Sequence, residues 1–248
     1  MPQPAPAHDE RTPTVSIRRH SSITRITHWI NALCLALLFM SGLQIFNAHP
    51  ALYWGDISTF DNPLAAIGEF SGWATIPSYQ DLAGGRLWHF FFAWLLVING
   101  TIYVLSAILS RHISRDLIPT RAELGHIGRS ISEHIRLRFP KGEEAKRYNV
   151  LQQLTYLVVI FGLLPLIIVT GLSMSPQLNA DFPWLPALFG GRQSARTVHF
   201  LAAWSLFAFF AVHVVMVVIS GFWNNMRSMI TGRYAIEVGE GDANTSKA

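Results

Sequence analysis

VHFLAAWSLFAFFAVHVVMVVI, residues Val198–Ile219, is an apolar segment of bilayer-spanning length with histidines at positions 199 and 213. On a straight helix, that spacing corresponds to roughly 21 Å along the axis and returns to within about 40° of the same face. Both imidazoles would then point the same way at two depths of a membrane. Ionisable side chains are costly to bury in hydrocarbon unless something binds them, so each histidine marks a candidate functional site. The alternative is that each imidazole only hydrogen-bonds a neighbouring helix.

The composition predicts an all-α membrane protein. Half of the 248 residues are apolar and 14% are charged, and the mean hydropathy of +0.30 is high for a soluble domain. We expect one four-transmembrane-helix bundle over residues 16–225, between a disordered N-terminal tail at 1–15 and a C-terminal tail at 226–248. Four runs approach the roughly 20 residues that a spanning helix needs: Ile26–Phe46, Leu87–Leu109, Leu154–Leu172 and Val198–Ile219.

Lysine and arginine are distributed unevenly along the chain. Four precede the first apolar run, nine lie between residues 111 and 147, and residues 47–85 contain none. The positive-inside rule then makes both termini and the central loop cytoplasmic, while the other two loops face the periplasm of a bacterium. We therefore expect a multi-pass protein of the bacterial inner membrane. A net charge of +4 could indicate nucleic-acid binding in a soluble protein, but here the distribution of the charge is more informative. We expect membrane lipid, and not nucleic acid, as a partner.

Cysteine chemistry is limited by the presence of a single cysteine, Cys34, inside the first apolar run. A disulfide within the chain and a cysteine-ligated iron–sulfur cluster are excluded. The sequence has no C-x-x-C-H motif, which excludes covalent attachment of a c-type haem.

Two further histidines match the depths of His199 and His213. His28 lies about a turn inside the cytoplasmic boundary, like His213, and His89 lies about a turn inside the periplasmic boundary, like His199. Zinc needs several ligands at one ion, whereas each depth offers only two. Two facing imidazoles suit the axial positions of haem iron, and bundle interiors commonly house such cofactors. Iron with both positions occupied favours electron transfer, and the sequence predicts the metal-ligand pairs His28–His213 and His89–His199.

Arginine precedes three of these histidines by three residues, at Arg25, Arg86 and Arg196. On a helix, each guanidinium falls on the same side as its histidine, one turn towards the nearest water interface. A haem propionate would project there, and arginine pairs well with carboxylates. The alternative is ordinary snorkelling of arginine at helix ends.

Polar residues at the start of the third run suggest a quinone site. Asn149 and Gln152 lie near the cytoplasmic histidine pair and could hydrogen-bond a quinone carbonyl. The alternative is a simple helix start at the interface.

The loop at 47–85 is long and rich in aromatic and acidic residues. Long ordered loops are usually functional, so we interpret it as a cap over the bundle and a docking surface for a periplasmic partner. Its aromatic side chains could instead only anchor it to lipid.

Several short motifs together resemble one family, the di-haem cytochrome b subunits of Ni/Fe hydrogenases and formate dehydrogenases within the prokaryotic cytochrome b561 type. The resemblance covers residues 16–225. Its motifs are Arg25-x-x-His28-Trp29, His89-Phe90, Tyr148-Asn149-x-x-Gln152, Pro165 with Thr170-Gly171-Leu172, and His199 with His213.

This resemblance implies two non-covalently bound b haems and a quinone site beside the cytoplasmic haem, to which Asn149 contributes. It implies a membrane subunit that transfers electrons between the quinone pool and a periplasmic redox partner, such as a molybdopterin oxidoreductase or a hydrogenase-like catalytic subunit. The long first loop departs from the short loop of the simplest members and leaves the partner open. One alternative is a stand-alone b561-type oxidoreductase that exchanges electrons with a small diffusible molecule. Another is a non-haem transporter or structural membrane anchor, which would be colourless.

Overall fold

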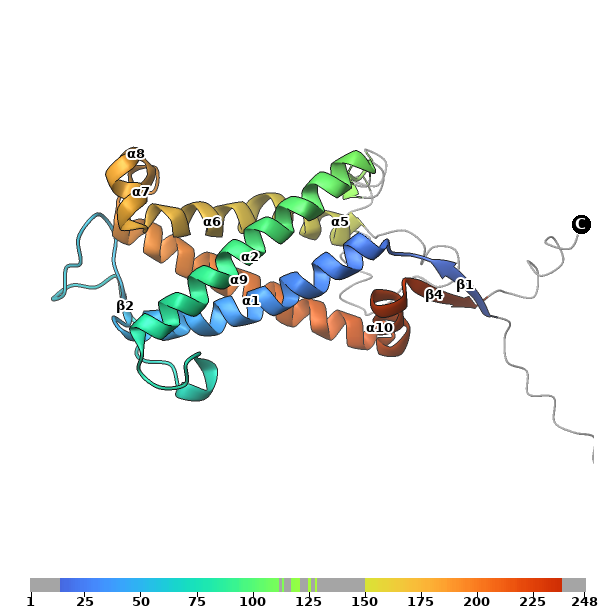
Figure 1. The fold of residues 1–248 in the computed structure, drawn as a ribbon, viewed down its shortest axis with the longest axis horizontal. Helices are drawn as coiled ribbons and strands as arrows, with labels where there is room; N and C mark the ends of the chain where they lie inside the picture. Colours follow the sequence, from blue (N-terminus) through green and yellow to red (C-terminus); the bar gives the residue numbers. More distant parts are fainter. Residues whose placement is uncertain are drawn as a thin grey trace, which may run out of the picture.

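The structure is a computed structural model, and it describes residues 14–111 and 150–237 together with residues 113, 117–120, 125 and 128. In this part of the chain, four helices are long and apolar enough to cross a bilayer, and they run lengthwise as a bundle (Figure 1). They are α1 (Ser22–Asn47), α2 (Leu82–Leu109), a third helix made of α5 (Val150–Val158), the π-helical turn η4 (Val159–Leu163) and α6 (Leu164–Ser173), and α9 (Arg192–Ile219). The predicted four-helix membrane fold is confirmed.

The four helices begin between four and six residues before the apolar runs that predicted them. At two of the four helices, a polar N-terminal cap explains the additional turn before the apolar run. The Ser21 side chain accepts a hydrogen bond from the Thr24 amide at 3.1 Å, and Asp81 accepts one from the Gly84 amide at 2.9 Å. These caps satisfy backbone donors that have no partner within the helix.

The third helix widens into the π-helical turn η4 just before Pro165. Proline has no amide hydrogen, and its ring crowds the carbonyl four residues earlier. A π-helical turn absorbs one extra residue and displaces that carbonyl. The helix therefore passes the proline and continues to Ser173.

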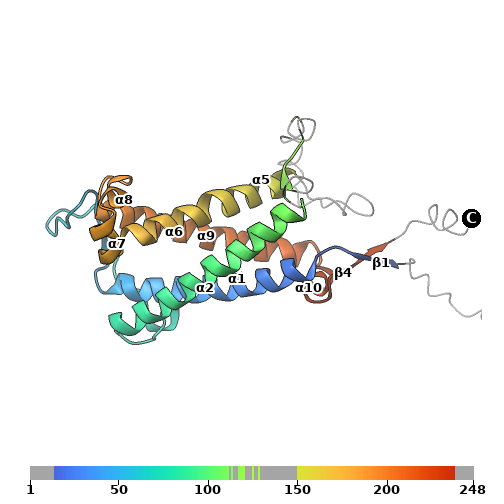
Figure 2. The same cartoon turned by 45° about the horizontal axis from the view of Figure 1, so that its top comes forward.

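The bundle consists of two helix pairs, α1 with α2 and α6 with α9 (Figures 1 and 2). Aromatic rings connect the pairs, because Phe39 stacks on Phe207 with ring centres 4.6 Å apart and Phe46 stacks on Phe200 at 4.7 Å. Most of the outer helix surface is exposed and apolar, as expected of a surface that faces lipid. A small cluster of buried side chains fills the α1–α2 interface: Cys34, Phe92 and Leu96.

The loops between α1 and α2 and between α6 and α9 form one end of the molecule, which we call the loop end (Figure 1). The short elements there are β2 (Ala51–Leu52), its antiparallel partner β3 (Ala65–Ala66), the 3-10 turn η1 (Gly72–Ala74), α7 (Pro176–Asp181) and α8 (Trp184–Ala187). The first loop is bound to the start of α9. Thr197 donates to the Tyr53 carbonyl at 2.7 Å, and the Gly55 amide donates to the Ser194 hydroxyl at 2.8 Å.

The opposite end, which we call the terminal end, carries α10 (Phe222–Thr231) and an antiparallel ladder of β1 (Thr14–Arg18) with β4 (Arg233–Glu237). Neither the ladder nor α10 was predicted. Thr14 and Val15 fall in the N-terminal tail that we expected to be disordered, yet their backbone is paired with Glu237 and Ile236. The predicted start of the C-terminal tail at 226 lies inside α10. Both departures have one cause, since these short segments are ordered by contact with each other.

Candidate functional site

The structure places the four predicted histidines in two facing pairs across the bundle. At the loop end, the His89 and His199 rings have centres 6.2 Å apart and planes inclined by 62°. At the terminal end, the His28 and His213 rings are 6.3 Å apart and inclined by 56°. Each pair joins α9 to a helix of the other half of the bundle. The pairs are therefore those that the sequence predicts, while their role as ligands stays a prediction.

These separations fit a metal ion held between two imidazoles. A ligating nitrogen lies about 2 Å from its metal ion and roughly 1.1 Å from its own ring centre, so two opposed ligands have ring centres roughly 6.2 Å apart. Within the residues that the structure describes, no three His, Cys, Asp or Glu side chains gather into a metal site. Among the described residues, each pair would hold a metal ion between two imidazoles, as a haem requires, and offers too few donors for a zinc site.

The loop-end pair is oriented by two hydroxyl groups. His89 Nδ1 lies 3.1 Å from Ser41 Oγ, and His199 Nδ1 lies 3.0 Å from Thr170 Oγ1. Ser41 donates its one proton to the Leu37 carbonyl at 2.7 Å, and Thr170 likewise donates to a carbonyl of its own helix at 2.7 Å. Both hydroxyls therefore accept from the rings, which puts the ring proton on Nδ1 and leaves Nε2 unprotonated. An unprotonated Nε2 is the form that binds a metal.

A glycine follows each of these hydroxyl residues and packs against the same ring. A Cβ on Gly42 would lie 3.5 Å from His89 Cε1, and a Cβ on Gly171 would lie 3.3 Å from His199 Cε1. The segments that contact the two rings have matching sequences, Ser41-Gly42-Leu43 on α1 and Thr170-Gly171-Leu172 on α6. Sequence reasoning missed the role of the hydroxyls. The repeated hydroxyl-Gly-Leu pattern in two apolar runs was the signal that could have found it.

The terminal-end pair has different surroundings. His28 Nδ1 is buried and has no hydrogen-bond partner among the described residues. The His28 ring meets Trp29 edge-on at 5.4 Å, and the His213 ring stacks on Phe209 at 5.9 Å. Aromatic contacts, rather than hydroxyl groups, surround these two imidazoles.

A buried polar contact between α1 and α2 lies one turn from His28. Asn99 is 4% exposed and donates to Asn31 Oδ1 at 2.7 Å and to the Thr27 carbonyl at 2.8 Å. Hydrogen bonds of this kind fix the spacing of helices in a membrane. This contact sets the position of the helix turn that carries His28.

The three arginines differ in their surroundings. Arg196 donates to the carbonyls of His49 and Ala51 and, together with Arg192, lines a cavity of about 240 Å³ at the loop end. Arg86 is exposed, and its guanidinium lies 5.6 Å from the centre of the Phe90 ring.

Arg25 points away from the bundle interior towards the ladder. It donates to the Ile230 carbonyl and to Ser22 Oγ. Of the predicted quinone-site residues, Gln152 lies in the first turn of α5 at the terminal end. Asn149 lies outside the described residues.

Comparison with known proteins agrees with this geometry. A family model described as prokaryotic cytochrome b561 matches residues 19–232, which include all four helices and all four paired histidines. The chain belongs to the prokaryotic cytochrome b561 family. Membership in this family implies a multi-pass membrane protein that binds haem b and takes part in electron transport.

A relative in this family comes from Azospira oryzae and is named as a protein-methionine-sulfoxide reductase subunit, YedZ1. It is 31% identical to this chain over 198 residues, which make up 80% of this chain and 89% of the relative. The similarity therefore extends over four fifths of this chain and most of the relative.

Proposed function

We propose that this cytochrome b561-type subunit binds two b haems and transfers electrons between membrane quinone and a separate redox partner. The observation that carries the proposal is the presence of two facing histidine pairs at opposite ends of one bundle. The ring centres within each pair are 6.2 and 6.3 Å apart. Each separation matches two opposed nitrogen ligands of a single iron. When bound, a haem with two histidine ligands supplies reversible one-electron exchange and no open position for a substrate.

The chain's own residues determine which nitrogen faces the metal site. At the loop end, Ser41 and Thr170 accept from Nδ1 of His89 and His199, so Nε2 of each ring is the available ligand. In other proteins, carboxylate or carbonyl groups that accept a hydrogen bond from a metal-bound histidine fix its tautomer and ring orientation in the same way. At the terminal end, the neighbouring aromatic rings restrict how far the imidazoles can turn.

Arginine side chains would neutralise the haem carboxylates. Arg196 and Arg192 line the loop-end cavity, while Arg86 precedes His89 by one helical turn. Arg196 also holds the first loop by two carbonyl groups. It would therefore couple the position of that loop to the charge of a propionate.

We place the quinone at the terminal end, beside His28 and His213. Gln152 lies in the first turn of α5 at that end, and Asn149 is its predicted companion from the sequence. An amide side chain can donate to a quinone carbonyl oxygen. The excess of lysine and arginine around the termini supports a cytoplasmic location for this end, in a bacterial inner membrane.

We place the redox partner at the loop end, facing the periplasm. Exposed aromatic side chains of the first loop support a docking role, with Trp73 84% and Phe60 71% exposed, since aromatic residues are enriched at protein interfaces. The name of the Azospira relative makes a catalytic subunit that reduces methionine sulfoxide in proteins the first partner to test. Co-purification of such a subunit with the full chain, and its loss when both aromatic residues are replaced by serine, would support the docking assignment.

The functional test uses purified protein in vesicles that contain a quinol. His213→Ala should remove the haem of the terminal end, abolish quinol-driven reduction and leave the loop-end haem at least partly bound. Ser205→Ala is the matched control, because Ser205 lies on the same helix as His213, donates to the Leu201 carbonyl and belongs to neither pair. Selective loss of the loop-end haem in His28→Ala would contradict the proposed pairing.

A further inference from the structure

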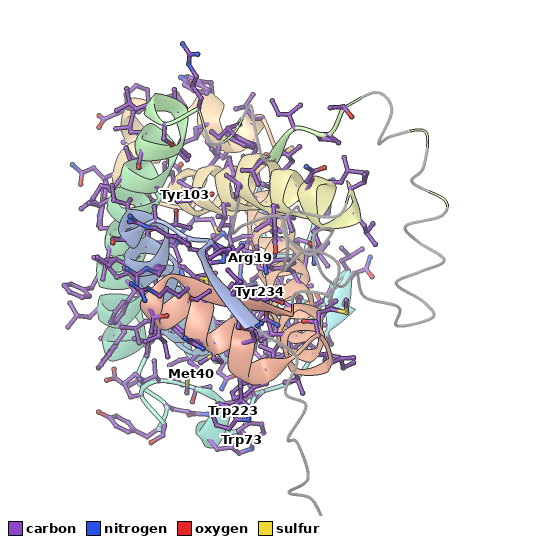
Figure 3. The ribbon with its side chains drawn as sticks, turned by 90° about the vertical axis from the view of Figure 1, so that its right-hand side faces the viewer. Arg19, Met40, Trp73, Tyr103, Trp223 and Tyr234 are labelled. Atoms are coloured by element: carbon purple, nitrogen blue, oxygen red, sulfur yellow. The ribbon has the colours of Figure 1, made fainter. Side chains whose placement is uncertain are left out.

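A basic cavity lies at the terminal end, apart from both histidine pairs. Its volume is about 480 Å³, and it is lined by Ser16, Arg18, Arg25, Thr231 and Arg233. The arginines come from β1, α1 and β4, segments distant in sequence that meet only in the folded chain. Figure 3 looks onto this end, where Arg19 and Tyr234 mark the ladder by the contact of a guanidinium with a ring at 4.6 Å.

The ladder brings two of the cationic side chains together. Arg18 lies directly opposite Arg233 in the antiparallel register, and opposed residues project on the same face of the strands. Like charges in this position destabilise a strand pair. The two guanidinium groups therefore repel each other across the β1–β4 ladder, and an anion between them would remove that repulsion.

No carboxylate lines this cavity among the residues whose side chains the structure describes. The one acidic residue described at the terminal end is Glu237, which pairs with Thr14 at the far end of the ladder from Arg233. The other acidic residues described belong to the loop end and the start of α2: Asp56, Asp61, Glu69, Asp81 and Asp181.

Arg25 presents an unused donor at the same place. Two nitrogens of its guanidinium donate to the Ile230 carbonyl and to Ser22 Oγ, while its Nε is buried with no hydrogen-bond partner within the described residues. Gly232, with φ +82°, gives it room, since a Cβ there would lie 3.4 Å from Nε. A buried guanidinium donor without a partner is costly, so this Nε adds to the uncompensated positive charge beside the cavity.

Apolar surface adjoins the cavity. Ile26, the residue after Arg25, is 61% exposed, and Ile230 is also 61% exposed. Both belong to helix turns at the end of the bundle, where hydrocarbon gives way to headgroups. The cavity thus combines a cluster of cations with a neighbouring surface suited to acyl chains.

We propose that this cavity is a specific site for the phosphate group of an anionic phospholipid. Guanidinium groups match phosphate oxygens geometrically, and anionic lipid is the phosphate source available at the membrane boundary. The bound lipid would neutralise Arg18 and Arg233 and so stabilise the ladder that holds the two terminal segments together. The site depends on the chain spanning a membrane and not on the haem assignment.

The test is native mass spectrometry of the delipidated full chain titrated with phosphatidylglycerol. The wild type should hold one lipid much more tightly than the rest and should show no such site for phosphatidylcholine. Arg18→Gln combined with Arg233→Gln should weaken that site about tenfold or more. Arg227→Gln is the matched control, because Arg227 is an exposed arginine of α10 that does not line the cavity.

Several outcomes separate this proposal from its competitors. Replacing both ladder arginines by lysine keeps the charge but loses the planar guanidinium, so its lipid affinity should fall between those of the wild type and the glutamine variant, which guards against a misfolded glutamine variant. Unchanged lipid binding in the glutamine variant would overturn the proposal. Complete displacement of the lipid by millimolar inorganic phosphate would identify free phosphate as the ligand and overturn the lipid source. A changed haem content with unchanged lipid binding would assign the cavity to a haem propionate and also overturn it.

Discussion

The two histidine pairs share one ring separation but differ in how their rings are held. At the loop end, each imidazole has a hydroxyl on Nδ1 and a glycine against one ring edge. At the terminal end, His28 Nδ1 has no hydrogen-bond partner among the described residues, and aromatic rings lie alongside. The loop-end pair is thus fixed by specific contacts from both halves of the bundle. The terminal-end pair depends on the helix positions, which suits the exchange of quinone that we propose at that end.

Combined histidine substitutions should have the largest effect, because they remove the proposed haem ligands. They also test whether the two pairs are independent. His28→Ala combined with His213→Ala should lose one haem, no more than His213→Ala alone. His28→Ala combined with His89→Ala should lose both haems, since one ligand is removed from each pair. Haem content per protein, measured by pyridine haemochrome assay, distinguishes these results. Equal haem loss in the two double variants would show that the rings are not paired as they face each other.

Adding a side chain at Gly171, which packs against the His199 ring, should have the next largest effect, confined to the loop end. Gly171→Val places methyl groups against His199 Cε1, where a Cβ alone would already lie at 3.3 Å. We expect the loop-end haem content to fall several-fold while the terminal-end haem is retained. Gly100→Val on α2 is the control, because a Cβ there meets nothing within 4 Å. Equal haem loss in both glycine variants would indicate general helix disruption instead.

Removing the hydroxyl partners should change the redox potential of one site only. Ser41→Ala combined with Thr170→Val removes the acceptors of the Nδ1 protons, which makes the imidazoles poorer donors to ferric iron. The loop-end midpoint potential should rise by up to about 40 mV for each hydrogen bond removed, the equivalent of about 1 kcal/mol per bond in a one-electron couple. Ser205→Ala is the control, since its hydroxyl donates only to the Leu201 carbonyl. A potentiometric titration in which both sites shifted equally would refute the local role of these hydroxyls.

Replacing Asn99 should have the smallest effect and should act at the terminal end. Asn99→Leu removes the hydrogen bonds to Asn31 and to the Thr27 carbonyl. The expected loss of stability is about 1 kcal/mol, measured by thermal unfolding in detergent, with a changed spectrum of the terminal-end haem only. Thr101→Val removes an exposed hydroxyl from the same helix and serves as the control. A changed loop-end spectrum would show that the contact supports the whole bundle.

The fold could be predicted from the sequence because length and hydropathy determine how often a chain crosses a membrane. The facing histidines could also be predicted, since helix geometry relates residue number to depth. Both inferences depend on local pattern alone. They needed no knowledge of which side chains meet across the bundle.

The remaining features depend on contacts between distant residues. The β1–β4 ladder pairs Thr14 with Glu237, and neither short strand has a pattern of its own strong enough to predict it. Arg196 was expected to face a propionate, and its bonds to two carbonyls of the first loop became visible only when that loop was placed. Ser41 resembles an ordinary small residue of a membrane helix until His89 is located beside it.

The central claim is that one chain holds two b haems, each between two facing histidines. Its most direct test is haem quantitation combined with a potentiometric titration of the purified wild-type protein. We predict two b haems per chain and two one-electron transitions, with no high-spin ferric signal because both axial positions of each iron are occupied. A colourless protein, or a single haem per chain, would contradict the account.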